Sequence, residues 1–400
     1  MKIGIIREGK IPPDSRVALT PVQCSFIMKN FPVEVVVEPS PVRCYKDEEY
    51  EAAGIHLTEF LYDCDLLMGI KEVPIGQLIP EKTYMFFSHT IKAQPYNRKL
   101  LQTVLKKKIR LIDYEVLTNE HGERLIAFGR FAGMVGAHNA LWTYGQRTCL
   151  FKLDRLKDHF DYAEAKEKYK NIKFPPIKIV VTGTGRVGSG AAEVLHDMGI
   201  REVSPHHFLH YNYDEAVFTH LSSKHYVARK DGKAFDYNDF YAHPEHYQSA
   251  FEPYFKVADV FINGIFWDTR SPAFFTTDDM KRNDFKINVI ADVTCDIAPK
   301  SSIPSTLRAT TIANPVFGYD PQTEAETEPY HENVVDMMTI DNLPSELPRD
   351  ASQAFGEKFI NSVLPELLDD NSVVIKRATI AENGELTAYF QYLQSYVDEL

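Results

Sequence analysis

One segment near the middle of the chain, IKIVVTGTGRVGSGAAEVLHDMGI, constrains the fold more than any other. The β-branched run at 177–181 predicts a buried strand, and the alanine-rich part after the glycines predicts a helix. The GxGxxG spacing between them allows a tight turn and points free N–H groups of the helix start at a pyrophosphate. We therefore expect a dinucleotide here, with a purely structural glycine-rich turn as the alternative. The expected cofactor-binding residues of this loop are Gly183, Thr184, Gly185, Arg186, Val187 and Gly188.

Strand-like and helix-like segments alternate along the rest of the chain. Runs such as MKIGIIRE, VEVVVEP, ADVFINGI and INVIADVTCD are apolar, and segments with helical spacing lie between such runs. This alternation predicts an α/β fold with parallel sheets. Asn263, Gly264 and Asp292 end two of the later runs, so we expect them to bind the cofactor at the carboxyl edge of the sheet. The acidic stretch DPQTEAETEP is expected to be a mobile loop.

The residues after the glycine motif bear on which dinucleotide binds. An acidic residue about 20 positions further on would hold the ribose hydroxyls of NAD. Here the strand-like AVFTHL ends instead in Ser222, Ser223 and Lys224, which suit a 2′-phosphate. The sequence therefore favours NADP(H) slightly over NAD(H), and an ordinary polar turn is the alternative reading of these three residues.

The order of these parts predicts two Rossmann-like domains with parallel sheets flanking an active-site cleft. Residues 134–335 are expected to form the dinucleotide-binding domain, which begins with a long helix. Residues 1–133 and 336–400 are expected to form a discontinuous substrate-binding and catalytic domain.

Three strands of the predicted catalytic domain end in ionisable residues, within GIKEVP, FFSHTIK and LIDYE. Charged groups gathered at one sheet edge shift one another's pKa values toward neutrality, as acid–base chemistry requires. The arginine of DSRVALTP, Arg16, follows the first strand and could grip a carboxylate with two hydrogen bonds. The ionisable residues of the three strand ends are Lys71, Glu72, His89, Lys92, Asp113 and Glu115.

Composition narrows the class of protein. A net charge of -12 makes wide contact with nucleic acid costly. The five cysteines are scattered, without the spacing of a zinc site or a disulfide framework, so we expect reduced thiols and no metal. No signal peptide or membrane-spanning run is evident, which predicts a cytoplasmic protein without membrane contact. Oligomeric state cannot be predicted from these features.

The motifs together resemble a known family. SRVALTP, GIKEVP, FFSHTIKAQ, RLIDYE, AFGRFAG, TGTGRVGSGA, FINGIFWD, ADVTCDI and IDNLPSELPRDAS occur in an order that is similar to the lysine-ketoglutarate reductase half of the aminoadipic semialdehyde synthases. The chain also resembles, more distantly, the lysine-forming saccharopine dehydrogenases and alanine dehydrogenase. The resemblance implies a stand-alone oxidoreductase that interconverts saccharopine with L-lysine and 2-oxoglutarate, using a nicotinamide dinucleotide and no metal.

The resemblance also implies roles for individual residues. Lys71 would act on the substrate amine, and His89 would serve the water lost or gained at the imine. Arg16 and Arg124 would hold substrate carboxylates, and Asp341 would border the nicotinamide. The remaining implied substrate-binding residues are Glu72, Lys92, Glu115 and Phe128.

One position departs from the fused reductases. Glu72 stands where those proteins have a basic residue, and this agrees better with the saccharopine dehydrogenases. The direction of the reaction and the choice of cofactor therefore stay open. An alanine dehydrogenase-like enzyme that uses ammonia and a non-catalytic nucleotide sensor are the alternative functions.

Overall fold

The protein, described here by a computed structural model of residues 1–399, divides into two compact units. The first unit contains Met1–Phe128 and the segment that begins at Pro348, and the second contains Gly129–Leu347. The unit changes at 128/129 and 347/348, about five and twelve residues from the predicted domain boundaries at 133/134 and 335/336, which stay a prediction. No helix within residues 1–399 combines the length and the apolar character that crossing a membrane requires.

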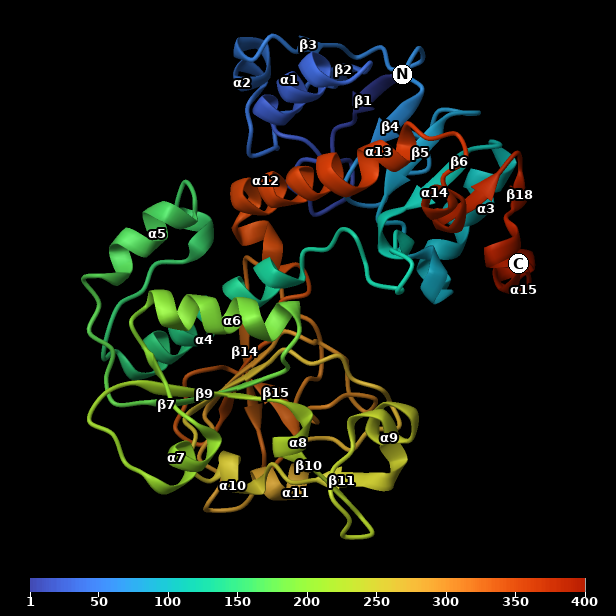
Figure 1. Cartoon of the computed structure of the whole chain (residues 1–400). Coiled ribbons are helices and arrows are strands. Elements are labelled where there is room, and N and C mark those ends of the chain that lie inside the picture. Colours follow the sequence, from blue (N-terminus) through green and yellow to red (C-terminus); the bar gives the residue numbers. More distant parts are fainter. Residues whose placement is uncertain (400) are drawn as a thin grey trace. The chain divides into compact units, whose positions relative to one another are not determined.

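The first unit is built on an eight-stranded sheet in the order β18-β17-β6-β5-β4-β1-β2-β3 (Figure 1). Six neighbouring strands, from β6 to β3, run parallel, whereas β17 and β18 are antiparallel. The strands are β1 (Lys2–Ile5), β2 (Glu34–Val37), β3 (His56–Leu57), β4 (Leu66–Met68), β5 (Thr83–Phe86), β6 (Arg110–Asp113), β17 (Thr379–Glu382) and β18 (Glu385–Leu386).

Helices cover this sheet, and their apolar side chains share one core with the strands. Phe355, Phe359 and Val363 bring the C-terminal helical segment into that core. The helices are α1 (Pro21–Asn30), α2 (Asp47–Ala52), α3 (Arg98–Lys106), α12 (Pro348–Lys358), α13 (Leu364–Leu367), α14 (Val373–Ala378) and α15 (Gln394–Asp398). Shorter or irregular helical turns are η1 (Thr90–Lys92), η2 (Pro95–Asn97), η3 (Tyr114–Val116), η7 (Phe359–Val363) and η8 (Ala388–Leu393).

The second unit repeats this plan with the order β15-β14-β16-β13-β12-β7-β9-β8. The six strands from β16 to β8 are parallel, and β14 and β15 are antiparallel. The strands are β7 (Lys178–Thr182), β8 (Arg201–Glu202), β9 (Val217–Leu221), β12 (Val260–Asn263), β13 (Val289–Asp292), β14 (Val316–Asp320), β15 (Ala325–Thr327) and β16 (Val335–Met338), with a separate hairpin of β10 (Val227–Arg229) and β11 (Tyr247–Ser249).

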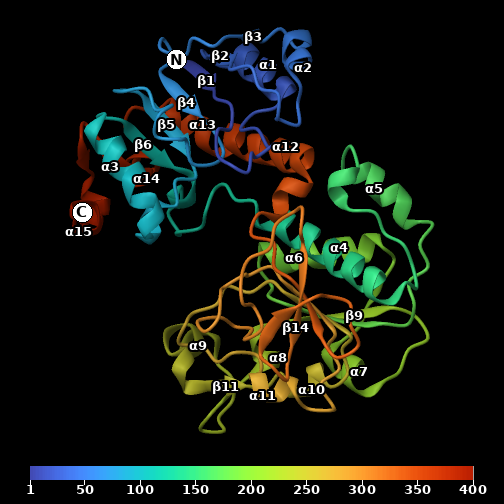
Figure 2. The ribbon, with the colours of Figure 1, turned by 180° about the vertical axis from the view of Figure 1, so that it is seen from behind.

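Helices α4 and α6 pack side by side against this second sheet, and α7, α10 and α11 lie on its other side (Figures 1 and 2). Glycines permit the close contact of α4 with α6, since a Cβ at Gly133 would lie 1.8 Å from the carbonyl oxygen of Val187. The helices are α4 (Gly129–Thr148), α5 (Tyr162–Tyr169), α6 (Arg186–Asp197), α7 (Pro205–His210), α8 (Ser223–Tyr226), α9 (Tyr237–Ala242), α10 (Glu252–Phe255) and α11 (Thr277–Met280), with short turns η4 (Leu156–Asp158), η5 (Pro244–His246) and η6 (Leu343–Glu346).

The α/β class with two largely parallel sheets is confirmed. One local prediction is wrong, because the acidic stretch near Asp320 forms the hairpin of β14 and β15 rather than a loop without regular structure. At this edge of the sheet, β14 pairs with β16. The backbone hydrogen bonds of this pairing do not require apolar side chains. The polar composition of the stretch therefore did not reveal the hairpin.

Candidate active site

The ionisable residues of the first unit lie at the carboxyl ends of four adjacent parallel strands, β1, β4, β5 and β6. The chain builds β1, β2 and β3 toward one edge and then β4, β5 and β6 toward the other, so the strand order reverses between β1 and β4. Ligands of such sheets bind at this switch point, outside the carboxyl ends of the strands. The residues that follow these four strands therefore occupy the expected place of a ligand site.

Glu72 is the hydrogen-bonding centre of this group. Its Oε1 lies 2.7 Å from His89 Nδ1, and its Oε2 accepts a hydrogen bond of 2.7 Å from Lys10 Nζ. Burial alone would raise the pKa of the Glu72 carboxyl, but the hydrogen bonds from His89 and Lys10 outweigh it and lower the pKa to about 2. Glu72 is thus a carboxylate at neutral pH, shared by two cationic or hydrogen-donating partners.

Lys71 lies beside this centre with its backbone held in place. The N–H groups of Ile70 and Lys71 donate to the two carboxyl oxygens of Glu8, at 2.6 and 2.9 Å. Burial, followed by the positive charge of Arg16, lowers the pKa of the Lys71 ammonium. Its Nζ has no hydrogen-bond or ion-pair partner among residues 1–399, so this amine can exchange a proton with a ligand.

His89 is held by its own backbone and by its neighbours. It adopts φ 53°, a left-handed conformation, directly after β5, and its ring stacks on Phe87 at a centroid distance of 6.4 Å. The preceding Ser88 donates its N–H, at 2.9 Å, and its hydroxyl to Asp113. Burial raises the pKa of Asp113 to about 6, against the lowering effect of these hydrogen bonds. The hydrogen bonds between buried Ser88 and Asp113 therefore hold the left-handed turn at His89 in place.

Arg16 already has contacts within the first unit. Its Nε and Nη2 contact the Oδ1 and Oδ2 atoms of Asp14 at 2.9 and 2.6 Å, and its guanidinium lies 4.2 Å from the ring centroid of Phe128. Both members of this ion pair are almost completely buried. The predicted carboxylate clamp already has a carboxylate partner, so a substrate carboxylate would have to share the guanidinium with Asp14.

Glu115 is paired with two cationic residues that were also predicted to bind the substrate. Its Oε1 lies 3.0 Å from Arg124 Nη2 and 3.9 Å from Lys92 Nζ. Its second oxygen, Oε2, is buried and has no hydrogen-bond partner within the described part of the chain, residues 1–399. Because a buried carboxylate oxygen without a donor is costly, this atom is suited to receive one from a ligand.

In the second unit, the glycine motif joins β7 to α6 as the sequence predicts. Gly183 has φ +94°, which favours glycine, and a Cβ at Gly188 would lie 1.6 Å from the carbonyl oxygen of Gly183. Gly185 caps α6 and has open space where its Cβ would be. Thr184 and Arg186 are exposed beside it, and Val187 is half-buried. The loop thus leaves room above the helix N-terminus for a phosphate group, and its residues fit a dinucleotide.

The predicted 2′-phosphate residues follow β9, the strand next to β7. The Ser222 hydroxyl lies 3.1 Å from His225 Nδ1 and accepts a hydrogen bond of 3.2 Å from the Tyr237 hydroxyl. Ser223 is buried, whereas Lys224 is exposed. Lys224 is therefore the side chain of this group that is available to an anion.

Asn263 and Asp292 are the last residues of the neighbouring strands β12 and β13, and their side chains are buried. Asn263 Nδ2 donates to Asp292 Oδ1 at 2.9 Å, and Thr306 donates to Asp292 Oδ2 at 2.7 Å. Burial raises the pKa of Asp292 to about 6. Gly264 packs against the glycine loop, and Asp341 is exposed after β16. Asn263 and Asp292 therefore support the expected cofactor site from within the sheet, since their polar side-chain atoms are already paired.

Four residues of these two sites were not identified from the sequence as site residues: Glu8, Lys10, Asp14 and, under the glycine loop, His220. His220 Nε2 lies 2.6 Å from the carbonyl oxygen of Gly183. Glu8 and Lys10 lie within five residues after the end of β1, so the reasoning that selected the residues after the other strands applied to them as well.

Comparisons with known proteins place this geometry in context. A family model, the alanine dehydrogenase/PNT N-terminal domain, matches residues 4–135. The chain is 32% identical to an alpha-aminoadipic semialdehyde synthase of Arabidopsis thaliana, over 98% of this chain and 41% of that protein. It is 26% identical to a saccharopine dehydrogenase [NAD(+), L-lysine-forming] of Emericella nidulans, over 94% of this chain and 95% of that protein.

The chain thus spans less than half the length of the semialdehyde synthases that it matches. Among solved structures, an L-alanine dehydrogenase is similar with a TM-score of 0.65 and 16% identity, covering 99% of this chain and 100% of that one. This last likeness shows a common fold.

Proposed function

The chain belongs to the family of the lysine-forming saccharopine dehydrogenases and lysine-ketoglutarate reductases, within the alanine dehydrogenase-like superfamily, and on that premise we propose that it interconverts saccharopine with L-lysine and 2-oxoglutarate. The proposed cofactor is a nicotinamide dinucleotide, which would supply or accept the hydride exchanged at the substrate carbon. The loop of Gly183, Gly185 and Gly188 would hold its pyrophosphate at the start of α6.

The observation that carries the proposal is the arrangement around Glu72. A half-buried lysine with a lowered pKa, Lys71, stands next to a carboxylate that is hydrogen-bonded to both His89 and Lys10. Making or breaking saccharopine needs one proton transfer at nitrogen and another at water. Two separately tuned proton carriers at one sheet edge match this requirement.

Lys71 is proposed to exchange the proton of the substrate amine. In the direction of saccharopine oxidation, the neutral amine of Lys71 accepts this proton, so that the substrate nitrogen can share its lone pair with carbon and form an imine. A lowered pKa keeps more of the lysine in the neutral form that this step needs. In the direction of reduction, the ammonium returns the proton.

His89 is proposed to act on water at the imine carbon. Because Glu72 is ionised, the Nδ1–H of His89 donates to it, and Nε2 is the nitrogen left to accept a proton from the attacking water. Collapse of the resulting carbinolamine breaks the C–N bond and releases L-lysine and 2-oxoglutarate. The carboxylate of Glu72 stabilises the imidazolium that forms in between.

The remaining charges are proposed to bind the ends of the substrate. Arg124 and Lys92 would contact carboxylates, Arg16 would share its guanidinium between Asp14 and a substrate carboxylate, and the buried Oε2 of Glu115 would accept a hydrogen bond from a substrate amine. Phe128 would support Arg16 from its other face.

NADP(H) is proposed as the preferred form of the cofactor. The exposed Lys224 at the end of β9, with no acidic residue between 220 and 230, supports a 2′-phosphate in preference to free ribose hydroxyls. The relatives that are named for NAD leave this preference to be tested.

The experiment is a spectrophotometric assay of reduced nicotinamide with purified protein. Oxidation of NADPH or NADH that requires L-lysine and 2-oxoglutarate together is the expected result, and saccharopine should reduce the oxidised cofactor in the reverse assay. Turnover of ammonia and pyruvate, without turnover of lysine, would replace the proposal by an alanine dehydrogenase-like activity. Nucleotide binding without turnover of either pair would indicate a sensor.

A further inference from the structure

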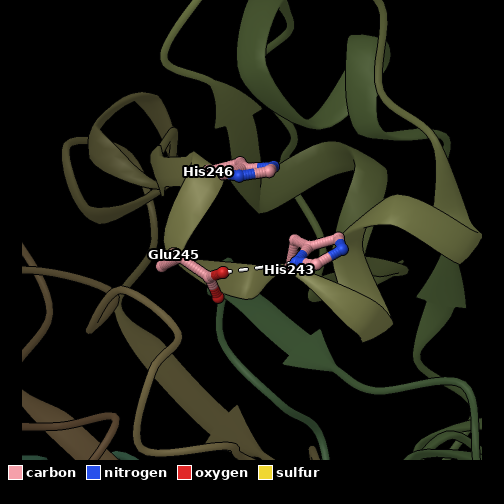
Figure 3. A group of neighbouring side chains, drawn as sticks. All are labelled: His243, Glu245 and His246. Carbon is pink, nitrogen blue, oxygen red and sulfur yellow. Dashed lines mark hydrogen bonds and ion pairs between the residues drawn. The ribbon is translucent and has the colours of Figure 1, made fainter.

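A group of metal-ligating side chains lies on the surface of the second unit, on the short segment that contains η5. His243, Glu245 and His246 each offer a ligand atom, and these atoms lie within 4.8 Å of one another (Figure 3). The two imidazole rings stack at a centroid distance of 5.0 Å and an angle of 21°. Glu245 Oε1 lies 3.3 Å from His243 Nδ1. We propose that this segment binds one divalent transition-metal ion, of the class of Zn²⁺, through two imidazoles and one carboxylate.

The local backbone explains why the three side chains converge. His243 precedes the 3₁₀ turn η5 and His246 ends it. Side chains three residues apart eclipse in a 3₁₀ helix, so the two histidines project on the same side. The sequence HPEH alone gave no such expectation, because in an extended strand the same positions would point to opposite faces.

The donor set selects the class of ion. Imidazole nitrogen with a single carboxylate suits Zn²⁺, Cu²⁺ and Ni²⁺, whereas Ca²⁺ and Mg²⁺ prefer sites made of oxygen. Bonds of about 2.1 Å in a tetrahedral site place ligand atoms about 3.4 Å apart. Exposed side chains at the separations found here need to move by only about 1 Å to reach that geometry, and water would complete the coordination.

The backbone of the segment is fixed without an ion. The N–H of His243 donates to Asp239 at 2.7 Å, and the carbonyls of His246 and Glu245 accept from Lys230 at 3.0 and 2.8 Å. Pro244 is buried. Because the turn is already ordered, binding would restrict only three side chains, and the entropic cost is small.

Two neighbouring charges act on the proposed site in opposite directions. Asp239 Oδ1 lies 3.6 Å from His246 Nδ1, so it can orient that ring and leave Nε2 toward the ion. Arg270 Nη1 lies 3.7 Å from Glu245 Oε2 and competes with a cation for this carboxylate. Arg270 is also paired with Asp268, which draws part of its charge away from Glu245.

The site has a structural consequence that is independent of the proposed oxidoreductase activity. Tyr241 and Pro244, on either side of His243, line an apolar pocket together with Phe266 and Trp267. An ion held at His243, Glu245 and His246 would fix one wall of this pocket.

The test is a Zn²⁺ titration of the full chain against a fluorescent chelator, in a Cys149→Ser background that removes the exposed thiol. We expect one saturable ion per chain, and His243→Gln, His246→Gln and Glu245→Gln should each weaken binding at least about tenfold. The matched control is His206→Gln, which changes another exposed and stacked histidine pair, His206 and His210, that has a centroid distance of 4.4 Å. It should leave the affinity unchanged.

Arg270→Gln supplies a second arm, because it should tighten binding several-fold by removing the competing cation. Circular dichroism checks that every variant is folded. Zn²⁺ binding that survives the His243→Gln/His246→Gln double change, or a wild-type chain that shows no saturable binding, would overturn the proposal. Weaker binding in folded Arg270→Gln would also contradict the proposed coordination by Glu245.

Discussion

Glu72 Oε1 and His89 Nδ1 lie 2.7 Å apart, although the two residues come from the ends of different strands, β4 and β5. These strands are neighbours in the sheet, which brings residues 17 positions apart into a hydrogen bond. The pair determines which imidazole nitrogen faces a ligand, and most of the expected effects in the first unit depend on it.

Glu72→Gln should lower kcat by about 10- to 100-fold, with a smaller effect on dinucleotide binding. The neutral amide cannot balance an imidazolium at His89 or the ammonium of Lys10, so the protonated histidine is less stable. Steady-state kinetics and fluorescence titration of the reduced cofactor measure these two effects, and Glu59→Gln, an exposed glutamate of the same unit, is the control. A wild-type kcat in Glu72→Gln would show that Glu72 does not act through His89.

Lys71→Met should reduce kcat by about 100-fold or more, because proton transfer at the substrate nitrogen loses its carrier. Dinucleotide affinity should stay the same, since the proposed binding loop belongs to the second unit. Single-turnover kinetics and fluorescence titration of the reduced cofactor separate the two quantities. Lys29→Met, an exposed lysine of the same unit, should have no effect on either. Wild-type turnover by Lys71→Met would remove this residue from the mechanism.

Asp113→Asn should change how stability depends on pH. The pKa of Asp113 is raised to about 6 in the folded protein, from an ordinary value of 3.8, so the folded state holds this proton more tightly. Its stabilising contribution is present in full below about pH 4 and is lost as pH rises through about 6, a change of about 3 kcal/mol.

The free energy of unfolding of the wild type, minus that of Asp113→Asn, should therefore fall as pH rises across this window. Urea unfolding at several pH values measures this difference in the free energy of unfolding. The altered hydrogen bonds add an offset that is the same at every pH, so the slope with pH is unaffected. Asp370→Asn, at an exposed position, should give a difference that is flat with pH. A flat difference for Asp113→Asn as well would show that its pKa is not raised.

Gly185→Ala and Gly188→Ala should separate binding from folding. Gly185 has φ -81° and open space at its Cβ, so alanine should change stability by less than about 1 kcal/mol. The added methyl group would occupy the expected phosphate position and weaken dinucleotide binding at least tenfold. In Gly188→Ala the methyl group would meet the Gly183 carbonyl, and thermal unfolding should reveal a loss of about 2 kcal/mol or more. Normal nucleotide affinity in Gly185→Ala would argue against the proposed phosphate site.

Lys224→Glu should reverse the cofactor preference. A carboxylate at this exposed position would repel a 2′-phosphate and accept hydrogen bonds from ribose hydroxyls, so kcat/KM should fall at least about tenfold for NADPH relative to NADH. Lys173→Glu makes the same charge change at another exposed lysine of the second unit and should leave the ratio as it is. If both variants shift the ratio equally, net charge rather than a specific contact explains the effect.

Most of the fold could be predicted because its signals are local. The β-branched run before Gly183 and the apolar runs ending at Asn263 and Asp292 form strands as expected. Within 201–251 the sequence suggested a strand only at AVFTHL, which forms β9, and the structure resolves most of the rest into short helices and the hairpin of β10 and β11. Elements of three to six residues are too short for periodicity to identify them.

The residues that stand at the ends of the strands can be identified from local pattern, because apolar strands and polar loops alternate along the chain. Lys71, His89 and the glycine loop were therefore candidates before the fold was known. Their partners became known from the fold: Glu72 contacts both His89 and Lys10, Asp14 pairs with Arg16, and Asn263 donates to Asp292. Such pairings depend on strand order and on burial, which bring distant residues together and set their pKa values, and neither is a local property of the chain.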